Sequence, residues 1–367
     1  MSKRKASLPS KADRKAITNM LGELTSTLET LLLSGLASAS QSTETQLAQT
    51  FRDASQLRLL RLGSTLRIAA EEVGRYTRND PLFSRRRYSF FINRAWMLSR
   101  GLQHAIEQQD VAHWQSLTWQ AGGATIDSLQ VVALGVSKRV VPDAFCGFEF
   151  RLRRIDDGSD APLKWSTIFP LKKGIDVPAE AYLRLPQKQK FKASDFLERQ
   201  VIQVDHCQLS EDGRIQMNDD TTVELKDAFE DWGRLATWDP ASAFERLQQY
   251  EVNPFELDIE LQEEAIVRDW RIAREFTDDR EQRVQTELVS GGVSFQVFSA
   301  KGREGKTFRA RLKKWAKESL PIFGILHYEH GDLVLQPLSV MEIDGPAWLS
   351  LDEKDIDYRN LIKALNL

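Results

Sequence analysis

The feature that most constrains this chain is a change in the spacing of its apolar residues near Gly122-Gly123. Before this point apolar residues recur every three or four positions, which is the period of an amphipathic helix. After it they alternate with polar residues, which is the period of a half-buried strand. The sequence therefore predicts an α+β protein, with an N-terminal helical bundle followed by an antiparallel β-rich region.

Three long helices are predicted in the first part of the chain. Their limits follow from apolar periodicity and from N-cap and glycine signals: Ile17 to Leu32, ended by Ser34-Gly35; Ser42 or Thr43 to Tyr76; and Asp80 or Ser84, as N-cap, to Ile106. Short links between helices of this length suit an antiparallel bundle. We expect a basic helical bundle over residues 1–121.

The next part of the chain has the element order of a small barrel. Strands are predicted at Leu129–Val141, Phe148–Arg153, Trp165–Phe169 and Ile202–His206, with a short helix at Ser194–Arg199. A glycine inside a long strand often marks a bulge or a sharp coil, and Gly135 is expected to do so. Three strands, a short helix and a final hairpin are the order of an OB-like barrel, which we place at residues 124–240.

Residues 241–367 are predicted to form an acidic α+β region with a closing strand–helix–hairpin unit. Its elements are a helix at Ala241–Tyr250, a strand at Val293–Ser299, a basic amphipathic helix at Thr307–Lys317 and a hairpin at Ile322–Met341 that turns at His330-Gly331-Asp332. The acidic stretch Leu257–Arg283 is left unassigned between strand and helix. No internal repeat stands out.

The net charge of -3 hides an asymmetry between the two ends of the chain. Residues 1–121 carry 17 basic and 10 acidic residues, a net of +7, and the remainder carries 33 basic and 43 acidic residues, a net of −10. Such a split favours either an anionic partner for the N-terminal part or two parts of the chain that face each other.

The sharpest charged feature is the run Arg85, Arg86 and Arg87 at the predicted start of a helix, shortly after Arg78. The helix dipole and the unpaired N–H groups there already carry positive partial charge, so these arginines need anions. Carboxylates of the acidic half, an acidic partner or phosphates could supply them. Pairing within a chain is the commoner outcome, which favours a lock between the two halves.

A second basic cluster consists of Lys188, Lys190 and Lys192 around Phe191, in a predicted loop. Such a cluster can hold a nucleic-acid backbone and stack a base on the aromatic ring. The more frequent arrangement is a solvent-facing loop with the aromatic residue in the core. Trp232 and Trp238 are likewise expected in the core rather than on a ligand platform.

The segment Ala300–Thr307 fits a relaxed P-loop pattern, which would put Lys306 on phosphates and Thr307 on magnesium. The chain that follows is too short for a doubly wound sheet, reads as a hairpin and has no apolar strand that ends in Asp. The sequence therefore predicts no nucleotide site here, and an NTPase is the least favoured function.

No metal, cofactor or catalytic residue is predicted. His206 and Cys207 are adjacent on a strand and point to opposite faces, and His327 and His330 are also separated by an odd number of positions. No Gly-x-Ser-x-Gly elbow is present, and Cys146 and Cys207 are too few for a disulfide scaffold, which fits a reducing, cytoplasmic compartment. No signal peptide or membrane span is expected.

Four segments, Leu57–Arg67, Gly74–Arg87, Lys138–Pro142 and Leu185–Phe191, resemble an uncharacterised bacterial protein family associated with SWIM zinc-finger proteins. The chain has no Cys-x-Cys…Cys-x-His finger of its own. The resemblance implies a bacterial cytoplasmic protein that works beside other proteins, and it carries no catalytic residue. We therefore predict a non-enzymatic interaction or scaffold subunit. The alternative is nucleic-acid binding through Arg85–Arg87 and the loop Lys188–Lys192.

Overall fold

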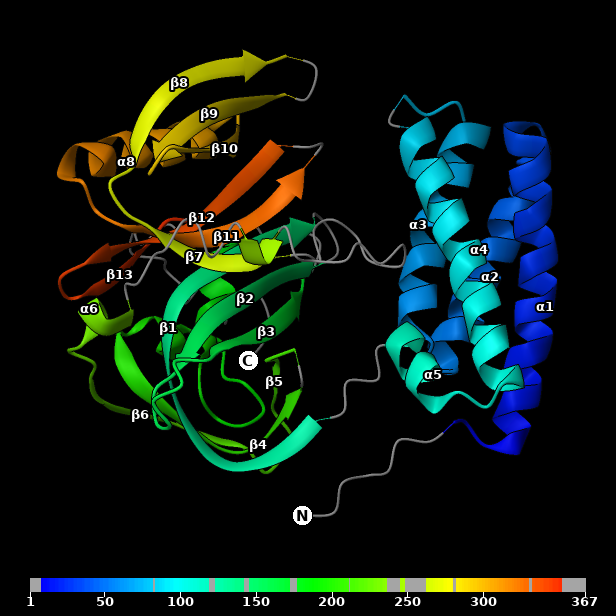
Figure 1. Ribbon diagram of the computed structural model, residues 1–367, viewed down its shortest axis with the longest axis horizontal. Helices are drawn as coiled ribbons and strands as arrows, with labels where there is room; N and C mark the ends of the chain where they lie inside the picture. Colours follow the sequence, from blue (N-terminus) through cyan, green and yellow to red (C-terminus); the bar gives the residue numbers. More distant parts are fainter. Residues whose placement is uncertain are drawn as a thin grey trace. The chain divides into compact units, whose positions relative to one another are not determined.

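The computed structural model describes two compact units (Figure 1). The described residues up to 118 belong to the first unit, and those from 123 onward to the second. The structure describes residues 8–81, 83–118, 123–141, 145–171, 177–210, 212–235, 245–247, 262–279, 282–329 and 332–351. The predicted α+β class, with a helical bundle before an antiparallel β region, is confirmed.

The first unit is a bundle in which three of the helices begin at serine N-caps. Its described elements are α1 (Lys11–Ser34), the 3₁₀ turn η1 (Gly35–Ser38), α2 (Gln41–Gln56), α3 (Leu60–Thr77), α4 (Arg85–Glu107) and α5 (Val111–Thr118). The side chains of Ser10, Ser40 and Ser84 accept backbone N–H groups of the first turns of α1, α2 and α4. Ser84 is one of the two N-caps predicted for the third helix.

The prediction of one long second helix was wrong, because the chain turns in the middle of this segment and forms two helices. α2 ends at Gln56 and α3 begins at Leu60, with Arg58 between them in the left-handed region at φ 60°. An added Cβ on Gly63 would lie 3.1 Å from the Ser55 Oγ and 3.7 Å from the Phe51 ring, so the two helices pack closely after the turn. The apolar period continues through Leu57 and Leu59, and therefore conceals the break.

The first part of the second unit is an OB-like barrel. Its described elements are β1 (Gly123–Val141), β2 (Phe145–Arg154), β3 (Pro162–Pro170), the 3₁₀ turns η2 (Ala179–Arg184) and η3 (Ala193–Leu197), β4 (Gln200–Ser210), β5 (Ile215–Gln216) and β6 (Thr222–Ala228). β1 pairs with both β2 and β4, and β5 and β6 both pair with β4. A parallel bridge between Lys164 and Arg214 joins β3 to the last hairpin and closes the barrel.

Gly135 marks a bulge in β1, as predicted. The pairing of β1 with β2 shifts register between Ala133 and Gly135. This bulge lets one long strand bend, so that its first half pairs with β4 and its second half with β2. The barrel core behind it is rich in aromatic rings, and the Trp165 ring stacks on both Phe150 and Phe196, which also contact each other.

The rest of the second unit repeats the same topology. Its described elements are α6 (Trp232–Leu235), β7 (Glu263–Val267), β8 (Arg271–Asp278), β9 (Arg283–Ser290), β10 (Val293–Ala300), α8 (Arg303–Glu318), β11 (Ile322–Glu329), β12 (Asp332–Glu342) and β13 (Gly345–Trp348). β8, β9 and β10 form a meander, α8 follows it, and β11 and β12 close as a hairpin. β10 pairs with β12 in parallel at Gln296 and Val334.

β7 and β8 together occupy the position in the second barrel that β1 occupies in the first barrel. β7 pairs with β11 and β8 pairs with β9, just as the two halves of β1 pair with β4 and β2. Between them Asp269 has φ 47°, and the Trp270 indole N–H donates to the Leu320 carbonyl at 2.7 Å. The unassigned stretch Leu257–Arg283 therefore contains two strands. The predicted strand, helix and hairpin after residue 293 are confirmed, whereas most of Ala241–Tyr250 lies outside the described residues.

The two barrels pack through the outer side of β1 and β2. Val132 and Leu134 of β1 share a buried apolar cluster with Phe323, Ile325 and Leu338 of the second barrel. The Ser339 hydroxyl donates to the Leu134 carbonyl, and the Ser350 hydroxyl donates to the Val136 carbonyl at 2.6 Å. These contacts join the barrels within one compact unit.

Candidate nucleic-acid interface

One three-stranded surface of the second barrel carries rings, guanidinium groups and amides, of which Arg274 and Phe276 are exposed and the others are partly buried. It is the outer side of β8, β9 and β10, where alternate side chains point away from the core that holds Leu288, Phe295 and Val297. We call this surface the open face, and its residues are Arg274, Phe276, Arg283, Gln285, Glu287, Gln296 and Phe298.

Two phenylalanines lie in one row across the open face. Phe276 and Phe298 are both paired with Gln285, one from each neighbouring strand. Strands lie about 4.8 Å apart, so the two rings are roughly 10 Å apart along the row. Phe276 is 42% exposed. The row therefore offers an exposed ring beside an amide and a second ring.

Each ring of the open face has an arginine beside it. The Arg283 guanidinium lies 3.9 Å from the centroid of the Phe298 ring, and that of Arg274 lies 5.9 Å from the Phe276 ring. Arg283 also pairs with Glu329 at 2.9 Å. A hydrogen bond from Ser294, and then one from Arg274, lower the pKa of Glu287. The face is therefore mixed in charge, and its rings are its distinctive feature.

On β1 and β2 the corresponding surface of the first barrel is covered, whereas Ile168 on the outer side of β3 is 66% exposed. Arg151 and Arg153 on β2 point outward, as Arg283 does on β9, but both pair with Glu264 of β7. Arg151 also donates to Glu149 at 2.6 Å and to Gln262 at 3.0 Å, and is only 9% exposed. The two barrels thus use one topological surface differently, since packing on the second barrel covers it in the first.

The predicted cluster Lys188, Lys190, Phe191 and Lys192 lies in the loop between η2 and η3 of the first barrel. Phe191 is buried beside Trp165 and Phe196, so it cannot stack a base. The three lysines are exposed around the turn, and Lys188 pairs with Asp219 at 2.6 Å. The loop therefore offers charge without a stacking ring.

The predicted arginine cluster begins α4, where its nearest described anion belongs to the same bundle. Arg87 pairs with Glu72 of α3 at 3.2 Å, and Arg85 and Arg86 are exposed. Glu72 is fully buried and also accepts Arg75 at 2.8 Å and the Ser84 backbone N–H at 3.0 Å. A carboxylate of the bundle, rather than of the acidic half of the chain, thus neutralises Arg87.

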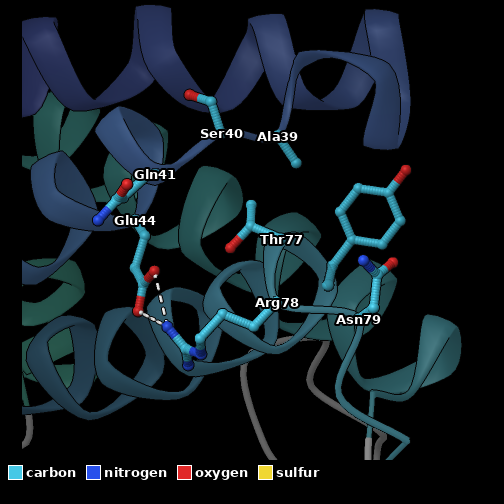
Figure 2. A pocket seen from close by; sticks show the side chains of 8 residues that line it. Ala39, Ser40, Gln41, Glu44, Thr77, Arg78 and Asn79 are labelled. Carbon is cyan, nitrogen blue, oxygen red and sulfur yellow. Dashed lines mark hydrogen bonds and ion pairs between the residues drawn. The ribbon is translucent and has the colours of Figure 1, made fainter.

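Arg78 lies at the edge of a polar pocket in the bundle. The pocket has a volume of about 520 Å³ and is lined by Ala39, Ser40, Gln41, Glu44, Tyr76, Thr77, Arg78 and Asn79. Figure 2 shows the Arg78 guanidinium against the carboxylate of Glu44, at 2.9 and 3.1 Å. An added Cβ on Gly74 would overlap Glu44, so this glycine makes room for the pair. The pair neutralises the cation that could have held an anion in the pocket.

The segment Ala300–Thr307 has none of the geometry of a phosphate loop. Only Lys301 and Gly302 separate β10 from α8, and Gly305 lies directly on the Ala300 carbonyl, with no room for a Cβ. Lys306 is an exposed residue of the first helical turn, and the Thr307 hydroxyl donates to the Arg303 carbonyl at 3.2 Å. The glycine of the motif serves helix packing, and the absence of nucleotide binding stays a prediction.

The histidines and cysteines that could have formed a metal site lie apart. His206 is exposed, Cys207 is buried on the neighbouring position of β4, and His327 is buried in β11. Burial raises the pKa of the Cys146 thiol to about 11 and lowers the pKa of His327. Among the described residues no group of three or more His, Cys, Asp or Glu side chains could hold a metal ion. In the same part of the chain, every helix is too short or too polar to cross a bilayer.

Sequence reasoning missed the open face, because it left Leu257–Arg283 unassigned. A signal was present in the alternation Arg274, Phe276, Asp278 and in the alternation Arg283, Gln285, Glu287 after it. Neither run shows apolar residues at every second position, since an exposed edge strand such as β8 has little core-facing surface.

No protein-family model and no curated protein matches the chain, and the resemblance to the SWIM-associated family stays a prediction. Several solved structures match 58% of this chain. A HINa domain of Ifi202 in complex with a 20 bp double-stranded DNA shares 9% identity, with 58% of this chain and 93% of that chain covered and a TM-score of 0.30. The tetrameric p202 HIN2 shares 12% identity, with 58% and 91% covered and a TM-score of 0.29. A murine DNA-binding protein bound with double-stranded DNA shares 9% identity, with 58% and 92% covered and a TM-score of 0.28.

Proposed function

We propose that the tandem-barrel unit binds single-stranded nucleic acid on the open face. The observation that carries this proposal is the 42% exposed ring of Phe276, in one row with Gln285 and Phe298 and with Arg274 and Arg283 beside the rings. OB barrels bind oligonucleotides on the surface of their second and third strands, which here are β9 and β10.

The chemistry of the open face suits unpaired bases. A base has a flat π-face whatever its identity, so an exposed ring can stack on it with little sequence preference. Gln285 and Gln296, which share a hydrogen bond of 2.8 Å, present amides that can meet base edges. Arg274 and Arg283 supply positive charge for phosphates or planar guanidinium groups for stacking. A paired base inside a duplex offers no such face, which is why a single strand is the proposed ligand.

Loss of the Phe276 ring is the central test. Phe276→Ala is expected to weaken binding of single-stranded DNA or RNA by about 1–3 kcal/mol, or roughly 5- to 150-fold, because one base loses its stacking partner. Fluorescence anisotropy of a labelled oligonucleotide measures the change. Leu225→Ala is the matched control, since Leu225 is 41% exposed on β6 of the first barrel. Equal affinities of the Phe276→Ala and Leu225→Ala proteins would remove the open face from consideration.

The basic loop of the first barrel is proposed as an additional phosphate contact. Lys188, Lys190 and Lys192 are exposed, and without a ring they can contribute charge only. Their replacement by alanine is expected to weaken binding at low salt and to flatten its dependence on salt concentration, with no change in base preference. An oligosaccharide ligand, the other common ligand of OB barrels, would show no such salt dependence.

The interaction-subunit hypothesis rests on a different surface, in the helical unit. Phe90 of α4 is 41% exposed one helical turn after Arg86, which is also exposed, and such an aromatic and basic pair suits an acidic protein partner. We propose this as the second candidate function. Capture from the native host with wild-type and Phe90→Ala protein, followed by mass spectrometry, tests it: an identical set of captured proteins would refute a role for this surface.

A further inference from the structure

The helix α8 carries basic residues at both ends of its solvent side. With about 100° between successive residues, Arg303, Lys306, Lys313, Lys314 and Lys317 fall within one arc of about 100°. We call these five residues the α8 ridge, and all five are exposed. Arg303 and Lys317 are 14 positions apart, so the ridge is about 21 Å long at a rise of about 1.5 Å per residue.

The helix is held so that the ridge cannot turn inward. Leu312 and Trp315 on the opposite side are buried against Leu288, Phe295 and Val297 of the barrel core. Arg309 donates to the Ser299 hydroxyl at 2.8 Å and to the Ala300 carbonyl at 2.9 Å. Arg311 donates to the Leu351 carbonyl at 3.0 Å. These two arginines anchor the helix, whereas the ridge residues are presented outward.

Carboxylates neutralise only part of the ridge. Lys313 pairs with Glu275 of β8 at 3.1 Å, and Lys314 lies 3.7 Å from Glu318. For Arg303, Lys306 and Lys317 no carboxylate lies within 4.0 Å among the residues that the structure describes. Arg303 and Lys306 moreover lie in the first turns of α8, where the helix dipole is unfavourable to cations. External anions would relieve this repulsion.

The α8 ridge, unlike the open face, contains no aromatic residue. Its five members are all cations, and Ala310 is the apolar residue that α8 exposes within the same arc. A protein partner would need an aromatic or aliphatic anchor, and an inserted membrane helix would need an outward apolar side, whereas α8 buries its apolar side on the sheet. Charge alone suits a regular array of phosphates.

We infer that the α8 ridge binds the sugar-phosphate backbone of double-stranded nucleic acid, independently of base sequence. A ridge of about 21 Å matches roughly six base pairs at about 3.4 Å per phosphate along one strand. Because α8 packs on the inner side of the layer whose outer side is the open face, the two surfaces bind separately. This inference is independent of the proposed single-strand site, and either one can fail alone.

The test uses the full chain and a short labelled duplex. The variant Arg303→Glu, Lys306→Glu, Lys317→Glu removes the three ridge cations that lack a carboxylate. Its affinity for the duplex at low salt is expected to fall by at least about tenfold, and the slope of log K against log salt by about 0.9 for each phosphate that the ridge no longer neutralises. The control Arg52→Glu, Arg67→Glu, Arg100→Glu makes the same change in net charge at exposed positions of the bundle, and is expected to have a smaller effect.

Two further variants test the role of the α8 ridge. The milder variant Arg303→Gln, Lys306→Gln, Lys317→Gln, with an unchanged circular dichroism spectrum, should show the same direction of change without reversed charge. Phe276→Ala should leave duplex affinity unchanged, which separates the ridge from the open face. No binding of the wild-type chain to duplex, an equal loss in the bundle control, or ridge-dependent binding to phosphatidylserine vesicles without duplex binding would each overturn the inference.

Discussion

The two barrels of the second unit share one topology and differ in what covers their outer strands. In the first barrel the outer side of β1 and β2 is packed on the second barrel, with Arg151 and Arg153 paired to Glu264. In the second barrel the outer side of β8, β9 and β10 keeps an exposed Phe276. On the first two strands, the same surface is therefore covered in one barrel and partly exposed in the other. The shared topology therefore does not show which surface could bind a ligand. The burial of each surface has to be known as well.

Among the substitutions that test this comparison, removal of Glu264 should cause the largest loss of stability. Glu264→Ala leaves Arg151 and Arg153 without the carboxylate that both contact, and all three side chains are 13% exposed or less. Breaking such a buried pair is expected to cost about 3–5 kcal/mol in the free energy of unfolding, measured by urea denaturation. Glu224→Ala breaks the exposed pair with Lys226 on β6 and is the control, with a loss near the limit of measurement. A small loss for Glu264→Ala would mean that apolar packing alone closes the first barrel.

The next largest effect is expected at Gly135. An added Cβ there would lie 2.7 Å from the Leu338 Cβ and 2.7 Å from the Phe323 ring, in the contact between the barrels. Gly135→Ala should therefore destabilise the tandem unit by about 1–3 kcal/mol through overpacking. Gly147→Ala on β2 is the matched control, since its Cβ would make an ordinary contact of 3.6 Å with Ile168. Equal melting temperatures for the two variants would contradict the close approach of the barrels.

A smaller, pH-dependent effect should distinguish the histidines of the two barrels. Burial lowers the pKa of His327 on β11 below its usual 6.5, whereas His206 on the corresponding strand β4 is exposed. Between the folded pKa and 6.5 the unfolded chain binds the proton more readily. The stability contribution of neutral His327 is therefore present above about pH 6.5 and is lost as the pH falls through the folded pKa.

Thermal melts at a series of pH values measure this effect. His327→Gln should flatten the loss of stability below about pH 6.5, and His206→Gln should leave the profile of the wild-type chain unchanged. If both variants show the wild-type profile, the acid sensitivity arises from other groups.

The smallest effect is expected at Lys306, the lysine of the P-loop-like segment. Lys306→Ala should change the free energy of unfolding by no more than about 0.5 kcal/mol, since the side chain is exposed. Isothermal titration calorimetry should detect no ATP or GTP binding to the wild-type chain, because Gly305 closes the space that a phosphate would need. Heat of nucleotide binding that disappears in Lys306→Ala would restore the NTPase hypothesis.

The sequence by itself determined the local elements of this protein. The change of apolar period near Gly122-Gly123, the Ser84 N-cap, the bulge at Gly135 and the closing helix and hairpin all follow from neighbouring residues, and the structure has them. These features depend on backbone conformation and side-chain alternation over a few residues, which sequence patterns report directly. The break between α2 and α3 was not predicted, because apolar residues continue through it.

Only the tertiary structure decided which surfaces are covered and which are open. Arg153 and Glu264 are 111 positions apart, and the whole meander of the second barrel separates β7 from its partner β11 in the sequence. No local sequence pattern could therefore predict either contact. The repeat of the barrel was also not visible in the sequence, because two segments can fold with the same topology while they have few residues in common. Phe191 and Phe276 are both phenylalanines near basic residues, yet one fills a core and the other faces solvent. That difference arises from long-range packing, which buries whatever apolar surface the assembled strands bring together.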